Sequence, residues 1–144
     1  MYDRGFTLIE LIAVMILVGI LSVVLMSRMG GVNTAGVQAG RDSLIAAFFF
    51  AQQTAMARAA VDNEIDVVVS ANTINVTENG NSLMGYPLTL SGGVTLIATV
   101  STPPPQPTFS YDKLGRTTPG IIIINHSSGT SATITVEASG YAHY

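Results

Sequence analysis

The sequence predicts an α+β protein in which one long N-terminal helix packs on an antiparallel β-sheet. Up to about residue 62, apolar residues recur at the three- and four-residue spacing of a helix. From Ile65 onward the apolar period changes to two, and short β-prone runs alternate with turn dipeptides. A helical half followed by a stranded half is typical of this class. With 144 residues, the chain has room for a single domain and an anchor.

Residues 6–29 are predicted to form a membrane-spanning helix with one anomalous charge. Leu11 to Ser27 is uncharged and would form about 25 Å of helix, and adding the residues from Phe6 brings it close to bilayer length. Glu10 lies at the head of this run. An acidic side chain costs roughly 2.5 to 3.5 kcal/mol at the centre of a membrane helix and less near an end. We therefore expect Glu10 to have a dedicated partner, which nothing else in this helix supplies.

The segment Gly5-Phe6-Thr7-Leu8-Ile9-Glu10 resembles the class III signal peptide of type IV pilins and pseudopilins. The resemblance implies that residues 1–5 are a leader, and that a prepilin peptidase cleaves between Gly5 and Phe6. It also implies methylation of the new Phe6 amine, and pairing of Glu10 with the amine of a neighbouring subunit during filament assembly. The alternative interpretation is an ordinary signal anchor with an accidental glutamate.

The same resemblance implies a fold, a location and partners. The fold would be the type IV pilin-like one, with a membrane half and an amphipathic half of a long helix packed on a sheet. The chain would be a single-pass protein of the bacterial inner membrane, its C-terminal domain in the periplasm, in contact with other pilins and an assembly platform. Two features depart from the family: Asp3 offsets Arg4, the only base before the apolar run, and no cysteine is available for a C-terminal disulfide.

Residues 30–62 are predicted to form the amphipathic half of the helix. Gly30-Gly31, Gly36 and Gly40 each lower helical propensity by roughly 1 kcal/mol, so we expect local melting or kinking there when subunits pack. Asp62-Asn63 would end the helix. A broad apolar stripe indicates a face turned to the core. Its predicted members are Leu44, Ile45, Phe48, Phe49, Ala55, Met56 and Ala59.

Residues 63–144 are predicted to form a β-rich globular head. Asn79-Gly80 is a strong hairpin signal, Pro87 indicates an edge or a bend, and the prolines of 102–107 indicate an extended loop. Gly115, Gly120 and Ser128-Gly129 are expected turns. The predicted strands are Ile65–Val69, Thr73–Thr77, Leu83–Leu90, Val94–Val100, Phe109–Tyr111, Ile121–Asn125 and Ala132–Glu137.

Nothing in the sequence indicates catalysis, a cofactor or a metal centre. His126 and His143 are isolated, whereas a metal needs convergent ligands. The acidic cluster Asp62, Glu64 and Asp66 lacks the pattern of a calcium loop and is read as a solvated edge. No nucleophile elbow or phosphate loop is present. The sequence therefore predicts a protein that is not an enzyme.

Composition also argues against nucleic-acid binding. The formal net charge is −3, and from residue 63 onward the only basic residues are Lys113 and Arg116. Neutralising phosphates requires several such residues on one surface.

The C-terminal half, including Phe109 to Arg116, resembles the H-type minor pseudopilins and minor pilins, among them those of mannose-sensitive haemagglutinin pili.

We therefore predict a structural subunit, a minor pilin or minor pseudopilin, of a type IV pilus or a type II secretion pseudopilus. A major pilin, or an adhesin or DNA receptor displayed on the same anchor, is the alternative. The 103–107 loop and the apolar strand 121–124 are where a partner of such a module would bind.

Overall fold

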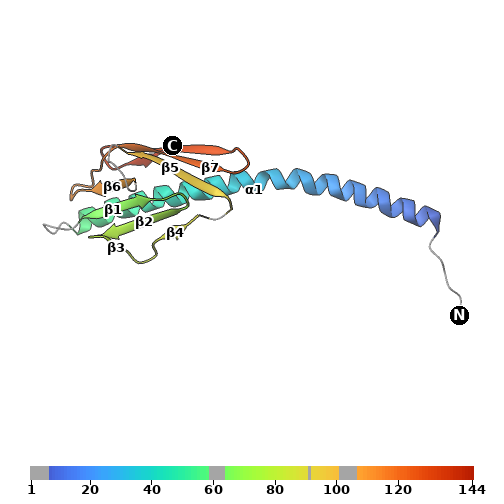
Figure 1. The fold of residues 1–144 in the computed structure, drawn as a ribbon, viewed down its shortest axis with the longest axis horizontal. Coiled ribbons are helices and arrows are strands. Elements are labelled where there is room, and N and C mark those ends of the chain that lie inside the picture. Colours follow the sequence, from blue (N-terminus) through green and yellow to red (C-terminus); the bar gives the residue numbers. More distant parts are fainter. Residues whose placement is uncertain (1–6, 59–63, 91, 101–106) are drawn as a thin grey trace. The chain divides into compact units, whose positions relative to one another are not determined.

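The computed structural model describes residues 7–58, 64–90, 92–100 and 107–144, without the side chains of residues 25–33 (Figure 1). The chain divides into two compact units, Met1–Val32 and Asn33–Tyr144. The second unit, which we call the head, contains all the described strands. The predicted leader, most of the proline-rich loop and the predicted helix end at Asp62-Asn63 lie outside the described residues.

Helix α1 extends from Leu8 to Ala57 and joins the two predicted helical segments. Gly36 and Gly40 lie within it. A Cβ atom at Gly36 would lie 3.7 Å from a Val94 methyl group, and one at Gly40 would lie 3.6 Å from the other Val94 methyl. Both distances are ordinary van der Waals contacts, so an alanine would fit at either position against Val94. The expected melting concerns packed subunits and stays a prediction.

The first sheet, sheet A, is built around β1, which pairs antiparallel with β2 on one side and β6 on the other. Its order is β3-β2-β1-β6, and β4 also pairs with β2. Asn79 and Gly80 join β2 to β3 with φ angles of 50° and 79°, which confirms the predicted hairpin turn. The strands are β1 (Ile65–Val69), β2 (Thr73–Glu78), β3 (Asn81–Ser82), β4 (Leu88–Thr89) and β6 (Thr108–Tyr111).

The second sheet, sheet B, is antiparallel throughout and has the order β5-β7-β8-β9. Its strands are β5 (Val94–Val100), β7 (Gly120–His126), β8 (Ser131–Val136) and β9 (Ala142–His143). The predicted fold class is confirmed, and the strands divide into two sheets. Strand β1 pairs with β2 and β6, and β5 pairs with β7.

The core joins part of α1 to the inner faces of both sheets. Leu44 and Phe48 are fully buried, and the Phe48 ring meets the Phe109 ring edge-on with a centroid distance of 4.9 Å. The predicted stripe was wrong at two positions, since Phe49 and Met56 are exposed. The buried face is rotated from the predicted one. It consists of Val37, Gly40, Leu44, Ala47, Phe48, Ala51, Thr54 and Ala55.

Three details of the stranded half differ from the sequence prediction. Residues 83–90 form only the short β4, because Gly85 has a φ of 90° and interrupts the strand. Gly120 begins β7 instead of forming a turn. A Cβ atom there would lie 2.7 Å from the Thr99 carbonyl oxygen, so the glycine permits close pairing with β5. Strands β3 and β9 were not predicted.

Candidate functional site

The start of α1 holds Glu10 in a capping box with Thr7. One Glu10 carboxylate oxygen accepts hydrogen bonds from the backbone N–H and the hydroxyl of Thr7, both at 2.9 Å. The Glu10 backbone N–H in turn lies 3.4 Å from the Thr7 hydroxyl oxygen. This reciprocal arrangement satisfies donors at the helix start. Among the described residues, Thr7 is therefore the partner of the Glu10 carboxylate, so the expectation that nothing near this helix start supplies one was wrong.

The first part of α1 exposes its apolar side chains on every side. From Leu8 to Val24 each residue is exposed, and Glu10 is the only charged one. The large apolar side chains of this segment are between 45% and 76% exposed. Ser22 satisfies its hydroxyl locally by donating to the Val18 carbonyl oxygen at 2.7 Å. A helix that is apolar all round is normally buried, so this segment, which we call the N-terminal helix, needs partners outside the chain.

The structure does not describe the other two residues that were predicted to take part in processing. Gly5 and Phe6 lie outside the described residues. In the part of the chain that the structure does describe, no helix has both the length and the apolar character required to cross a membrane.

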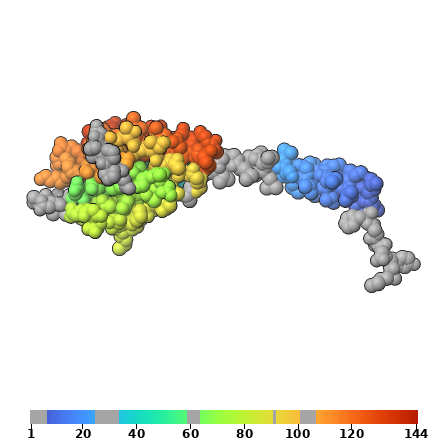
Figure 2. All heavy atoms as spheres, viewed as in Figure 1, coloured from blue at the N-terminus to red at the C-terminus, as the bar shows by residue number. Residues whose placement is uncertain are grey.

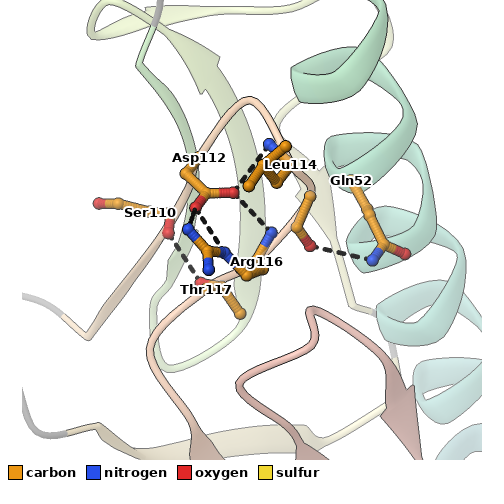
Figure 3. Close-up of polar contacts among 7 residues, drawn as sticks. Gln52, Ser110, Asp112, Leu114, Arg116 and Thr117 are labelled. Atoms are coloured by element: carbon orange, nitrogen blue, oxygen red, sulfur yellow. Dashed lines mark hydrogen bonds and ion pairs between the residues drawn. The ribbon is translucent and has the colours of Figure 1, made fainter.

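A polar cluster in the head holds the β6–β7 connection (Figure 3). The Asp112 carboxylate accepts hydrogen bonds from the backbone N–H groups of Leu114 and Arg116, and pairs with the Arg116 guanidinium at 2.8 Å. These bonds, led by the one from the Arg116 N–H, hold the pKa of Asp112 below its usual value. The cluster stabilises a turn and pairs Arg116 with an acidic residue. Lys113 is the other Lys or Arg residue that follows β6.

Gln52 connects this turn to the C-terminal segment. Its amide group donates to the carbonyl oxygens of Gly115 and Ser139, both at 3.0 Å. Tyr111 donates its hydroxyl to the Gly140 carbonyl oxygen at 3.0 Å, and burial raises the pKa of this tyrosine. These three hydrogen bonds, of which the Tyr111 bond is buried, hold the C-terminal segment to α1 and β6 through backbone carbonyl groups.

The two histidines lie apart, each with local partners. His126 Nδ1 lies 3.0 Å from the Ser128 backbone nitrogen and 2.8 Å from its hydroxyl oxygen. His143 Nε2 lies 3.3 Å from a Glu137 carboxylate oxygen. Among the described residues, no three His, Cys, Asp or Glu side chains gather closely enough to hold a metal ion. Asp62 of the predicted acidic cluster lies outside those residues.

Sequence reasoning missed an exposed apolar surface on the head. Phe49 and Met56 of α1 are 58% and 47% exposed, and Leu114 and Tyr141 are more exposed still. A signal for this surface is present in the sequence: Ser43 to Ala57 contains no charged residue, so the helix has no charged face to present to water.

Comparison with known proteins finds one matching sequence motif and two similar solved structures. Residues 1–26 match the model of the prokaryotic N-terminal methylation motif. The chain is similar to a crystal structure of the minor pseudopilin EpsH from the type II secretion system of Vibrio cholerae, with a TM-score of 0.60 and 12% identity over 76% of this chain and 92% of that one. A second EpsH structure gives a TM-score of 0.57 and 15% identity over 74% and 94% of the two chains.

No curated protein matches the chain in sequence. The solved structures and the motif agree: the chain is type IV pilin-like and resembles minor pseudopilins. At these identities, the structural likeness concerns the fold.

Proposed function

We propose that this chain is a structural subunit, a minor pilin or minor pseudopilin, of a type IV pilus or a type II secretion pseudopilus. The observation that carries the proposal is a methylation motif at the start of a helix whose apolar side chains are exposed from Leu8 to Val24. Packing this helix against the same helices of neighbouring subunits removes that surface from water. Assembly is therefore its principal function.

Processing prepares the end of this helix for assembly. A prepilin peptidase cleaves between Gly5 and Phe6 and methylates the Phe6 amine. Glu10 then pairs with the Phe6 amine of an adjacent protomer. In the single chain Thr7 holds the Glu10 carboxylate, and assembly exchanges these bonds for a charge-assisted one. Since an incomplete ion pair in an apolar environment is unfavourable, the pair enforces the register between subunits.

The N-terminal helix also anchors the chain before assembly. The subunit is held in the inner membrane with its head in the periplasm, and an assembly platform draws it into the filament. The head's likeness to EpsH favours a minor subunit over a major one. Counting copies per filament by mass spectrometry separates these two cases.

Processing gives the most direct test. Gly5→Val should abolish cleavage, so that the variant keeps its leader and Phe6 stays unmethylated, as mass spectrometry of the purified chain would show. Gly19→Ala is the matched control: a Cβ atom at Gly19 meets nothing within 4 Å, so this variant should be processed normally. A wild-type chain that retains Met1 in cells containing an active prepilin peptidase would contradict the proposal.

A further inference from the structure

We infer that the head binds an arginine side chain of a partner protein at Asp66 and Asn75. Both residues lie on the face of sheet A that is turned away from the core, which we call the outer face. This inference goes beyond the proposed function, which concerns the N-terminal helix, because it assigns a contact to the head. It is drawn from two buried oxygen atoms that accept no hydrogen bond.

The outer face of sheet A is polar and nearly uncharged. Val67 and Val76 lie opposite each other on β1 and β2 and are buried in the core. Side chains alternate along a strand, so Asp66 and Asn75 point to the outer face. The green atoms of these two strands lie at the surface of the head in Figure 2. Among the residues of the described strands on this face, Asp66 is the only charged one. The others are Val68, Thr73, Asn75, Thr77, Ser82, Thr89, Thr108 and Ser110.

Asp66 and Asn75 are diagonal neighbours on this face. Asp66 lies opposite Thr77, and Asn75 lies two residues before Thr77 on the same strand. Diagonal neighbours in a sheet are roughly 7 to 8 Å apart, which is within reach of one long side chain. Ser110 lies opposite Asp66 on the other side of β1 and is exposed, so a partner can approach the carboxylate from solvent.

Each of the two side chains has a buried oxygen atom without a hydrogen-bond donor. These atoms are Asp66 Oδ1 and Asn75 Oδ1. The Asn75 amide nitrogen donates to the Ser82 hydroxyl oxygen at 3.0 Å, so only its oxygen lacks a partner. None of the ion pairs among the described residues includes Asp66. Because a buried polar group without a partner costs free energy, these oxygens call for a donor from outside the chain.

The chemistry of the two oxygens favours an arginine side chain. A guanidinium group has five N–H donors in one plane and a permanent positive charge, so it can donate to both oxygens and match the carboxylate. A calcium ion takes about six to eight oxygen ligands, whereas the strands contribute one carboxylate to this face. Among the described residues, no three His, Cys, Asp or Glu side chains gather to hold a metal. Arg116, which follows β6, already pairs with Asp112 at 2.8 Å.

Asp66→Asn tests whether the fold uses the charge. Asparagine keeps the shape of the side chain, removes the unpaired charge and supplies an amide group that can donate to Asn75 Oδ1. The melting temperature of the full chain in detergent should therefore stay the same or rise, as is common when a binding residue is replaced. A lower melting temperature would show that the carboxylate already has a partner within the chain, and it would overturn the inference.

Binding is tested with N-acetyl-arginine amide, by following the NMR signals of the Asn75 side-chain amide in the full chain. These signals should shift in a saturable way. N-acetyl-citrulline amide is the matched probe, because a neutral urea group replaces the guanidinium, and it should give no saturable shift. Asp66→Asn should weaken binding of the arginine probe about tenfold, since it removes a hydrogen bond to a charged group.

Glu137→Gln is the matched control for net charge, because it removes an exposed carboxylate outside sheet A. This variant should bind the arginine probe as the wild type does. The inference is overturned if the arginine probe gives no saturable shift, if both variants weaken binding equally, or if calcium chloride at the same ionic strength gives the same shift. Processing that still depends on Gly5 would leave the proposed function standing in each of these cases.

Discussion

The two parts of α1 differ in composition and in their surroundings. From Leu8 to Val24 the helix is apolar and exposed on all sides, whereas from Asn33 to Ala57 it buries Leu44 and Phe48 completely. The difference lies in what the rest of the chain supplies. Strands that follow the helix cover one side of its second part. In the proposed function, the first part serves assembly, whereas the second part serves folding.

The largest effect that this comparison predicts is on assembly alone. Glu10→Ala removes the carboxylate that the proposal pairs with a neighbouring amine, so incorporation into filaments should fall to background. The head should keep its wild-type melting temperature, because Glu10 contacts only Thr7 among the described residues. Filament pull-down and thermal unfolding of the full chain in detergent measure the two effects separately.

Thr7→Ala is the control for this experiment, because it removes the partner within the chain and keeps the carboxylate. Loss of such a cap costs a helix about 1 kcal/mol. This variant should therefore enter filaments better than Glu10→Ala. Equal defects in the two variants would mean that the capping box, and not the pairing between subunits, determines incorporation.

Phe48 and Phe49 are adjacent in sequence and differ in burial, so they test the comparison within the head. Phe48→Ala should destabilise the head by about 3 to 5 kcal/mol, since it leaves a cavity against Phe109. Phe49→Ala should change the free energy of unfolding by less than about 1 kcal/mol, because its ring is mostly exposed. Urea unfolding of the two variants gives both values.

The opposite result, a larger loss for Phe49→Ala, would mean that α1 turns a different face to the core.

Gly140 provides a third test, of the contacts that hold the C-terminal segment on the head. Its φ is 84°, and an added Cβ would lie 1.9 Å from the Gly115 carbonyl oxygen. Gly140→Ala should cost about 2 to 3 kcal/mol. Gly129→Ala is the matched control, with a φ of 89° and nothing within 4 Å of the added atom, and should cost only about 1 kcal/mol for the backbone. Similar melting temperatures for the two variants would contradict this packing.

The parts of the fold that depend on local chemistry could be predicted from the sequence. The Asn79-Gly80 hairpin and strand β5 follow from turn chemistry and alternation, and the structure confirms both. The rotation of the helix stripe could not be predicted, because Phe48, Phe49 and Phe50 are consecutive and span more than half a helical turn. Only the sheets decide which of the three rings enters the core.

One short strand and one surface of the head were also missed. Strand β9 has two residues and follows β8 after a short turn, and so short a run shows no alternation that could predict it. The exposed residues Phe49 and Tyr141 line one hollow although they are far apart in the chain. No local sequence pattern predicts that these residues lie close together. For the N-terminal site, the motif predicted Glu10, whereas its capping box with Thr7 was missed although the Thr-x-x-Glu spacing is a sequence signal for one.

The smallest predicted effect is a pH dependence confined to the head. Hydrogen bonds from the Arg116 backbone lower the pKa of Asp112, so the ionised carboxylate favours the folded state above the pKa of an unfolded aspartate, about 3.9. This stabilisation should be lost as the pH falls through the lower pKa of the folded state. Asp112→Asn should therefore be less stable than wild type at neutral pH, and the difference in stability should narrow as the pH falls below about 3.9. Thermal unfolding of both proteins across this range measures it. A constant difference at every pH would mean that the turn depends on the shape of the side chain and not on its charge.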